Sequence, residues 1–258
     1  MKTTVELPKY HELSDAELKQ WTPEEFTQKI IDKSTQFAEA FYHVSNWEKV
    51  NLDEEEKKQN LVKFCSRIGW REFYLGVHPP SKQIVLLESN PEDIGIRIRL
   101  AQQIIDEVKH QRIWGKWAKK YGGSSRIQDY EVEPDVLKQF QLTSDYDDPT
   151  KIAINLQLTS EVTLPFLLGY GTLSPEENIT AQIMPEDLRK GIRKEVVDDE
   201  PRHIAVGRDI MIKYCGEDAD KRRALLELHN TRLQNTMILQ SNEVNLLGAE
   251  RTTPFPNI

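Results

Sequence analysis

The chain contains 258 residues, and its 34 Lys and Arg against 42 Asp and Glu leave a net charge of −8. Hydrophobic residues make up 38% and charged residues 29%, a balance that supports a sizeable core and argues against general disorder and bulk nucleic-acid binding. No stretch approaches the roughly 18 consecutive apolar residues of a membrane span, and residues 1–10 lack the apolar core of a signal peptide. We therefore expect a cytoplasmic protein without a membrane segment.

Helix-starting patterns recur along the chain. The run Thr-Pro-Glu-Glu at 22–25 combines a capping Thr, a Pro at the first helical position and a Glu three residues after the cap. Asp53 and Asn90 open two further helices, and Pro79 and Pro80 are expected to end the helix that precedes them. Together these patterns predict helices over residues 22–46, 53–76, 90–121, 136–141, 148–168, 185–214 and 218–247.

The remaining segments do not change this fold class. Residues 83–87 form a short apolar run that suits a strand, but one isolated strand cannot form a sheet, and residues 252–258 are expected to be extended. Cys65 and Cys215 are far apart and are expected to be small core residues rather than disulfide partners. The sequence thus predicts an all-α bundle in a single domain over 1–258, with a bundle core at about 53–214 and additional N- and C-terminal helices.

Carboxylates interrupt the apolar faces of four of these helices. In the second helix, Glu72 falls in the stripe formed by Leu61, Cys65, Ile68 and Leu75. Four buried carboxylates would repel one another, and each would carry a desolvation penalty of several kcal/mol. The same helical spacing turns these further residues inward: Glu107 and His110, Glu161, and Glu200 and His203.

Divalent metal ions would compensate this buried charge. One Glu from each of two helices, with Glu-x-x-His from each of two others, is the ligand set of di-iron and di-manganese four-helix proteins. A Glu and a His three positions apart lie on one helical face, so each motif presents both side chains to the same ion. Mixed nitrogen and oxygen ligation favours iron or manganese and leaves zinc open. The alternative is that these are ordinary exposed Glu residues and two core His residues.

Both motifs extend to Asp-Glu-x-x-His, with Asp106 and Lys109 in the first and Asp199 and Arg202 in the second. This doubled motif resembles the DExRH pair of bacterial multicomponent monooxygenase hydroxylases, which belong to the ferritin-like di-iron carboxylate proteins. The interval between the second-helix and third-helix Glu, across a turn that contains Pro, is similar to that in the catalytic subunits of phenylacetyl-coenzyme A epoxidases. The resemblance covers about residues 53–214 and implies a ferritin-like four-helix bundle.

The resemblance also implies roles for individual residues. In such proteins the Asp before each motif Glu is a partner of a ligand His, so Asp106 and Asp199 are expected to orient imidazoles across the bundle, beside Lys109 and Arg202. The implied metal ligands are Glu72, Glu107, His110, Glu161, Glu200 and His203. Candidates for the substrate pocket, which are otherwise plain core residues, are Trp114, Leu164 and Phe166.

Three positions depart from the related patterns. Trp114 stands where radical-forming subunits of ribonucleotide reductase carry Tyr, which disfavours the radical-forming class. Pro165 stands where multicomponent hydroxylases often carry Thr, and it predicts a distorted turn beside Glu161. Pro201 predicts a second kink inside the last motif, and both prolines are otherwise packing devices.

The resemblance implies an oxygen-activating enzyme with two iron ions, manganese remaining open, and O₂ as co-substrate. It would hydroxylate, epoxidise or N-oxygenate a small organic or acyl-thioester substrate. A separate reductase would supply electrons, because the chain has no GxGxxG and no CxxC pattern. The alternatives are a ferroxidase, a radical-generating subunit and a non-catalytic bundle subunit. The helix over 218–247 is expected to pack on its own bundle, with a homodimer interface as the alternative.

Overall fold

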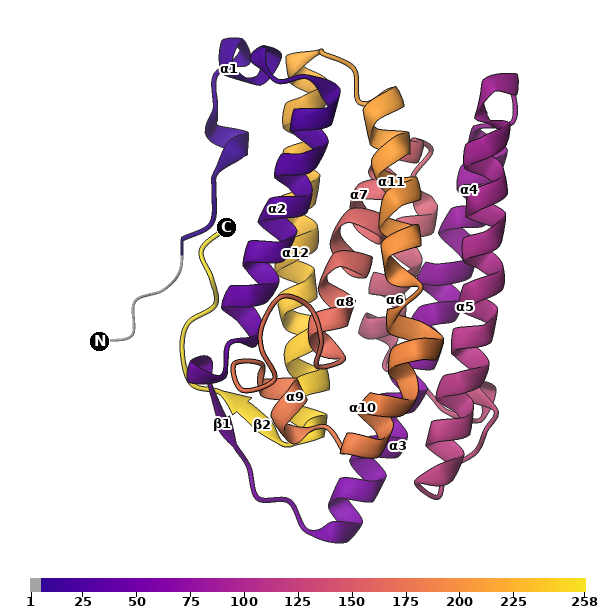
Figure 1. Ribbon diagram of the computed structural model, residues 1–258, viewed down its shortest axis with the longest axis vertical. Coiled ribbons are helices and arrows are strands. Elements are labelled where there is room, and N and C mark those ends of the chain that lie inside the picture. The colour runs from indigo at the N-terminus through magenta and orange to yellow at the C-terminus, as the bar shows by residue number, and fades with distance from the viewer. Residues whose placement is uncertain (1–5) are drawn as a thin grey trace.

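The computed structural model describes residues 6–258, which are mainly helices running along one long axis (Figure 1). Among these residues, every helix is too short or too polar to cross a membrane. The α-helices are α1 (Asp15–Gln20), α2 (Pro23–Tyr42), α3 (Glu54–Arg71), α4 (His78–Leu86), α5 (Ile94–Lys120), α6 (Pro134–Leu142), α7 (Pro149–Asn155), α8 (Glu161–Leu167), α9 (Ile179–Ile183), α10 (Glu186–Ile192), α11 (Glu200–Tyr214) and α12 (Ala219–Leu247). Short 3₁₀ turns occupy Tyr10–Glu12, Val44–Asn46, Pro91–Asp93, Ile127–Asp129 and Thr143–Asp145.

Three π-helical segments interrupt the longer helical runs, and each adjoins a predicted metal ligand. They span Glu72–Val77, Leu156–Ser160 and Arg193–Val197. Glu72 begins the first segment and Glu161 directly follows the second. Glu200 follows the third after two turn residues. Single π turns inside helices are frequent at functional sites, because the wider turn redirects side chains and backbone carbonyls.

Pro79 and Pro80 do not end a helix, so this prediction is wrong. They lie in the first turn of α4, which continues the helical run beyond the first π-helical segment. A Pro in the first turn removes no helical hydrogen bond, because the N–H groups there lack an intrahelical acceptor in any case. The apolar run at 83–87 consequently lies in the last turns of α4 and at its end.

Helical irregularities lie near both of the prolines that the sequence analysis singled out. The N–H of Glu161 bonds to the carbonyl of Leu156, five residues back, so the wide turn comes just before Glu161, whereas α8 continues through Pro165. Asp198 and Asp199 form a turn, and Pro201 follows in the first turn of α11. The single helix predicted over 185–214 is therefore divided into α10, a π-helical segment and α11.

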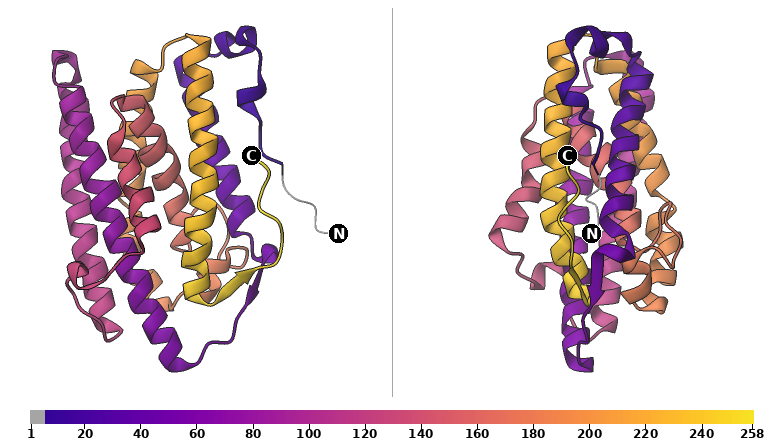
Figure 2. Two further views of the ribbon diagram at one scale, coloured as in Figure 1. Left: turned by 180° about the vertical axis from the view of Figure 1, so that it is seen from behind. Right: turned by 90° about the vertical axis from the view of Figure 1, so that its left-hand side faces the viewer.

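The helices form a layered bundle. The α4–α5 pair lies at one edge and α2 with α12 at the other, with α7, α8 and α11 between them (Figure 1). Seen from behind, the lower part of α3 runs between α5 and α12 and contacts both (Figure 2). As predicted, α12 packs on helices of its own chain, and Cys65 and Cys215 are buried and unpaired.

The two larger of three hydrophobic clusters in the described residues lie on either side of a polar layer. Along α5, Ile96 and Leu100 belong to one cluster, whereas Trp114 and Ala118 belong to the other. The α7–α8 run and the α10–α11 run also contribute residues to both clusters. In each of these three runs the predicted metal ligands lie between the two clusters, so the fold encloses them about midway along the bundle.

A small antiparallel sheet, which the sequence did not predict, joins distant parts of the chain. Strand β1 (Trp47–Lys49) pairs with β2 (Ala249–Arg251), and Trp47 lies opposite Arg251. The Arg251 guanidinium stacks over the ring of Phe41 at 5.0 Å and donates to its carbonyl at 3.0 Å. The cation–π contact and the hydrogen bond fix β2 to the end of α2.

Candidate metal centre

The six predicted ligands come from four helical runs and are all removed from solvent. Their exposed fractions are only 0–1%. Glu72 follows α3, the first motif lies in α5, Glu161 starts α8, and the second motif starts α11. Long polar side chains are rarely buried so completely unless they are paired or bind a metal, so this group requires a specific compensation.

The side chains converge in two overlapping groups. One group consists of Glu72, Glu107 and His110, and the other of Glu107, Glu161 and His203. Within each group, one ligand atom from every residue lies within 4.8 Å of the others. Glu200 completes the second group, with its Oε2 3.3 Å from Nδ1 of His203. Glu107 therefore belongs to both groups.

Several of these buried atoms have no hydrogen-bond partner. They are Oε2 of Glu161, both carboxylate oxygens of Glu200 and both ring nitrogens of His203. Nδ1 of His203 lies 3.2 Å from Glu107 and 3.3 Å from Glu200, but neither contact has hydrogen-bond geometry. Buried polar atoms that face one another unpaired are costly in a native structure, and a shared cation would satisfy them. The donor set of carboxylates and imidazoles therefore fits two divalent metal ions.

Burial and mutual repulsion perturb the pKa values of the carboxylates. Burial, and then the charge of Glu107, raise the pKa of Glu72 to about 8. Burial and Glu200 raise the pKa of Glu161 well above its usual range. Burial would also raise the pKa of Glu107, but His203 and His110 outweigh it and hold that pKa well below its usual range. Glu107 thus stays ionised in the absence of a metal.

Both imidazoles are strong bases in this setting. Burial lowers the pKa of His110, but its contacts with Asp199 and Glu107 outweigh burial and raise the pKa to about 10. Burial likewise opposes charge on His203, and Glu107 with Glu200 raises its pKa to about 12. Both imidazoles therefore hold protons in the metal-free protein, so metal ions and protons compete for their ring nitrogens.

Each motif aspartate faces the histidine of the other motif. Nε2 of His110 lies 3.2 Å from Oδ2 of Asp199, while its Nδ1 lies 3.1 Å from Glu107. Nε2 of His203 lies 3.7 Å from Oδ2 of Asp106. Each histidine therefore directs Nδ1 into the site and Nε2 towards an aspartate of the other motif.

The two basic motif residues hold these aspartates. Arg202 donates from Nη2 to Asp106 at 3.1 Å and to Asp199 at 2.6 Å. Lys109 donates to Asp106 at 3.0 Å. Arg202 thus links both aspartates and lowers the freedom of the carboxylates that face the imidazoles.

The three residues considered for the substrate pocket are all buried, but they have different surroundings. Trp114 donates from Nε1 to Oε1 of Glu72 at 3.2 Å, which places its indole against a metal ligand. Leu164 and Phe166 belong to a large hydrophobic cluster, and Phe166 stacks on Tyr42 with ring centres 6.3 Å apart. None of the three lines the cavity that adjoins the site.

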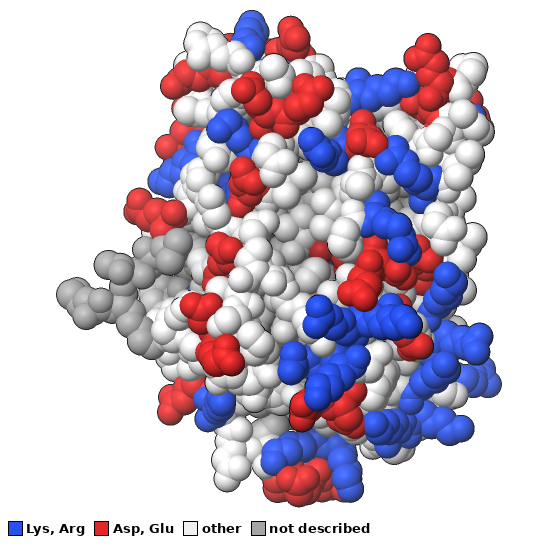
Figure 3. Space-filling view, in the orientation of Figure 1, with Lys and Arg blue, Asp and Glu red and all other residues white. Residues whose placement is uncertain are grey.

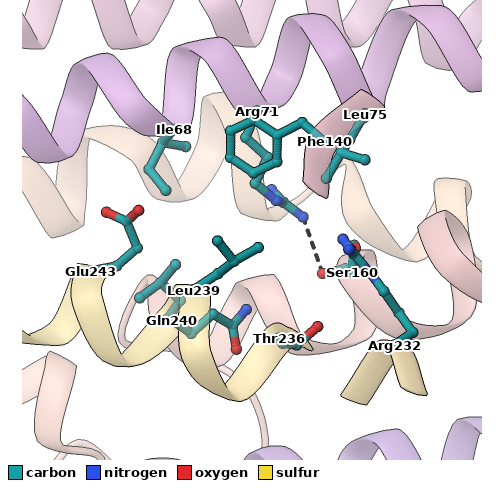
Figure 4. Close-up of a pocket in the computed structure, with 11 residues that line it drawn as sticks. Ile68, Arg71, Leu75, Phe140, Ser160, Arg232, Thr236, Leu239, Gln240 and Glu243 are labelled. Carbon is teal, nitrogen blue, oxygen red and sulfur yellow. Dashed lines mark hydrogen bonds between the residues drawn. The ribbon is translucent and has the colours of Figure 1, made fainter. Parts of the chain in front are cut away.

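Two arginines that the sequence analysis missed line that cavity (Figure 4). Arg71 is buried beside the ligands, with Nη1 3.8 Å from Glu72 and Nη2 3.9 Å from Glu161. Its Nη2 also donates to the carbonyl of Ser160 at 3.1 Å, in the π-helical segment. Arg232, from α12, donates to the Ser160 hydroxyl at 2.8 Å.

A buried glutamine chain supports Glu107 from the other side and was also missed. Nε2 of Gln103 lies 3.5 Å from Oε1 of Glu107, and Gln157 donates to Gln103 at 3.2 Å. Gln157 donates as well to Gln83 at 2.9 Å. These residues come from three helical runs, so only the tertiary structure reveals that they form one network.

Comparison with known proteins does not assign the chain to a family. No protein-family model matches the chain, and no curated protein matches it significantly.

Proposed function

We propose that this chain is an O₂-activating di-iron oxygenase with a ferritin-like four-helix core. The core would consist of the α3, α5, α7–α8 and α10–α11 runs, with α2 and α12 as additional helices. The observation that carries the proposal is the shared position of Glu107 in two buried ligand groups, beside atoms of Glu161, Glu200 and His203 that lack hydrogen-bond partners. Two adjacent metal sites bridged by one carboxylate are the basis of two-electron chemistry on O₂ in four-helix proteins.

The residues have distinct parts in this function. Two ferrous ions, when bound, would supply the electrons that reduce O₂. The six ligands hold the ions, and their burial keeps bulk water away from the reacting atoms. Asp199 fixes the orientation of His110 through a hydrogen bond at Nε2, and Asp106 faces Nε2 of His203 at 3.7 Å, so that Nδ1 of each ring is directed into the site.

The substrate is a small organic molecule or acyl thioester that would be hydroxylated, epoxidised or N-oxygenated. Electrons would come from a separate reductase. Lys and Arg side chains gather over α10 and the neighbouring lower end of α5 and offer a docking face to an acidic electron donor (Figure 3). Exposed members of this basic face are Lys116, Lys119, Lys120, Lys190, Arg193 and Lys194.

The decisive experiment measures metal content and oxygen reactivity together. Protein produced with ample iron is analysed for metal per chain, reduced without oxygen, and scanned optically as O₂ is admitted. We expect about two irons per chain, the number of sites in this ligand set, and a transient absorbing species. Glu107→Ala should lose metal and remain helical by circular dichroism, whereas the exposed Glu55→Ala on α3 should retain both ions.

Other outcomes favour the alternatives. Two irons that merely oxidise and then accumulate further iron indicate a ferroxidase, and a stable protein radical indicates a radical-generating subunit. Two manganese ions without oxygen reactivity change the metal and reject the oxygenase. The absence of stoichiometric metal, or full metal in Glu107→Ala, rejects the site itself.

A further inference from the structure

A small cavity lies directly beside the candidate metal centre, enclosed by α3, α6, α8 and α12. Its volume is about 30 Å³, whereas one water needs about 10–15 Å³ by the same measure. It therefore has room for a group of two or three non-hydrogen atoms. Arg71 and Ser160 are the immediate sequence neighbours of the ligands Glu72 and Glu161, so the cavity adjoins the centre without containing a ligand.

Two buried guanidinium groups face this cavity. Arg71 is 7% exposed and Arg232 is 5% exposed, and both point towards Ser160 from opposite walls (Figure 4). Each guanidinium donates one hydrogen bond to Ser160. Nη1 of Arg71 and Nε of Arg232 remain buried without a hydrogen-bond acceptor. Unpaired buried N–H donors of charged groups are costly, and two of them lining one cavity point to an anionic ligand.

The balance of charges around the cavity also points to an anionic ligand. Arg71 faces Glu72 and Glu161 when no metal is present, but two divalent ions would neutralise the four carboxylate ligands. The charges of Arg71 and Arg232 would then have no counter-charge among the ligands. Burial, and then repulsion by Arg71, lower the pKa of Arg232 to about 10. Among the residues that the structure describes, Glu243 is the one carboxylate that lines the cavity, 3.5 Å from Nη1 of Arg67, so it offsets one of the two arginine charges and leaves the other without a counter-charge.

The rest of the cavity wall is largely apolar. Ile68, Leu75, Phe140 and Leu239 contribute hydrocarbon surface. Leu239 also lines an adjacent outer cleft of about 340 Å³, between α3, α6 and α12, which is large enough for a small organic molecule. A small anionic head matches the inner cavity, and a short apolar body matches its hydrocarbon wall and the Val136, Ile238 and Leu239 surface of the otherwise polar outer cleft.

We propose that the Arg71–Arg232 cavity binds the carboxylate of the substrate, so that the substrate is a small carboxylic acid with an apolar body. This inference rests on the proposed function and narrows its substrate class. The planar guanidinium matches a carboxylate in shape and charge, and the cavity is too small for a phosphate ester with its attached group. The carbon that reacts would lie near the carboxylate, because Arg71 directly adjoins the metal ligands.

The test is titration calorimetry on the full chain, both metal-free and loaded with ferrous iron without oxygen. The probes are sodium butyrate, its uncharged match butyramide, and sodium formate as an anion without an apolar body. Arg232→Gln removes one guanidinium from the cavity, Arg232→Lys keeps the charge, and Arg99→Gln removes an exposed arginine from α5 as the matched control. Circular dichroism and thermal unfolding establish that each variant is folded.

We expect the iron-loaded wild type to bind butyrate more tightly than formate and to ignore butyramide. Arg232→Gln should lose about tenfold or more in butyrate affinity, Arg232→Lys should lose less, and Arg99→Gln should match the wild type. Iron loading should strengthen butyrate binding, because it removes the negative charge beside Arg71.

Three results would overturn the inference. They are no butyrate binding in either form of the protein, equal binding of butyrate and butyramide, and wild-type affinity in Arg232→Gln. If formate binds as tightly as butyrate, the cavity binds small anions without regard to an apolar body, and the substrate assignment is rejected. Two irons per chain without butyrate binding reject the carboxylate site alone. Butyrate binding through Arg232 in a protein that takes up no stoichiometric metal when iron is supplied rejects the proposed di-iron function alone.

Discussion

Asp199 shows how a single residue outside the ligand set controls a ligand. Its carboxylate lies 3.2 Å from Nε2 of His110, and Arg202 holds it from the solvent side. A hydrogen bond at Nε2 leaves Nδ1 of His110 free to face the site. His110 and Asp199 lie on different helices, so this contact also holds α5 and α11 in register.

Asp199→Asn is expected to weaken metal binding by about 10–100-fold, because the neutral amide no longer favours the tautomer and orientation of His110 that the site needs. Competition against a chromophoric chelator measures this loss. The adjacent exposed Asp198→Asn removes the same charge without touching a histidine and should bind metal as the wild type does. Equal metal affinity in the two variants would show that Asp199 is only a surface charge.

The first π-helical segment brings a helix backbone unusually close to a ligand. A Cβ atom added at Gly76 would lie 2.6 Å from Cγ and 2.8 Å from Cβ of Glu107. These atoms are near the α5 backbone and cannot swing away, so only a hydrogen at this position leaves Glu107 in place. The wide turn that starts at Glu72 thus packs directly on the residue shared by both metal groups.

Gly76→Ala is therefore expected to displace Glu107 and to lower metal content well below two ions per chain, with little loss of helix. Elemental analysis and circular dichroism on the same sample separate these effects. Gly95→Ala in α5 is the matched control, since nothing lies within 4 Å of its added Cβ. It should keep its metal and gain up to about 1 kcal/mol in the free energy of unfolding. Full metal in Gly76→Ala would contradict the packing argument.

α12 carries a stripe of polar residues that faces inward. His229, Arg232, Thr236, Gln240 and Glu243 follow one another at helical spacing and are all buried. The first member packs on α2, where Nε2 of His229 lies 2.8 Å from the hydroxyl of Ser34. Burial, and then the charge of Lys33, lower the pKa of His229 to about 3, so the folded protein keeps this ring neutral.

This shift makes stability depend on pH. An unfolded histidine has a pKa of about 6.5, so between about pH 6.5 and pH 3 only the unfolded chain takes up the proton on His229. As the pH is lowered from about 6.5 to about 3, the free energy of unfolding should decrease by on the order of a few kcal/mol. Urea unfolding of metal-free protein at several pH values measures the slope, which should be shallower in His229→Gln. The exposed His78→Gln should keep the wild-type slope, and identical slopes in all three would refute the assignment.

At the scale of the whole molecule, the candidate metal centre lies between the two larger hydrophobic clusters and joins four helical runs. Without ions, this layer contains repelling carboxylates and unpaired buried atoms. A ligand that binds only the folded state stabilises it, by about 2.7 kcal/mol per site at a free concentration 100 times its dissociation constant.

Removal of metal is therefore expected to lower the melting temperature by at least about 5 °C in a chain of this size. Scanning calorimetry of iron-loaded and chelator-treated protein measures the shift. Glu107→Ala should melt at one temperature under both conditions, since it holds no metal to lose. Equal melting temperatures for the two wild-type samples would mean that no ion is bound within the bundle.

Local sequence patterns determined most of the helix starts and the inward faces of the helices. Thr22 and Asp53 cap their helices as predicted, because capping depends only on neighbouring residues. Periodicity placed Glu72 and Glu161 inward for the same reason, and the structure buries both. Pro79 was misjudged because a wide turn ahead of it allows a new helix to start there.

The sequence by itself determined that carboxylates and two histidines lie on apolar helix faces, since this follows from spacing along single helices. Only the tertiary structure decided which of them meet, with Glu107 shared between two groups and Asp199 facing His110 from another helix. The Arg71–Arg232 cavity was equally hidden, because its two arginines are far apart in sequence and neither stands out from an ordinary charged helix position. Contacts between distant segments depend on how whole helices pack, and periodicity within one helix carries no information about its neighbours.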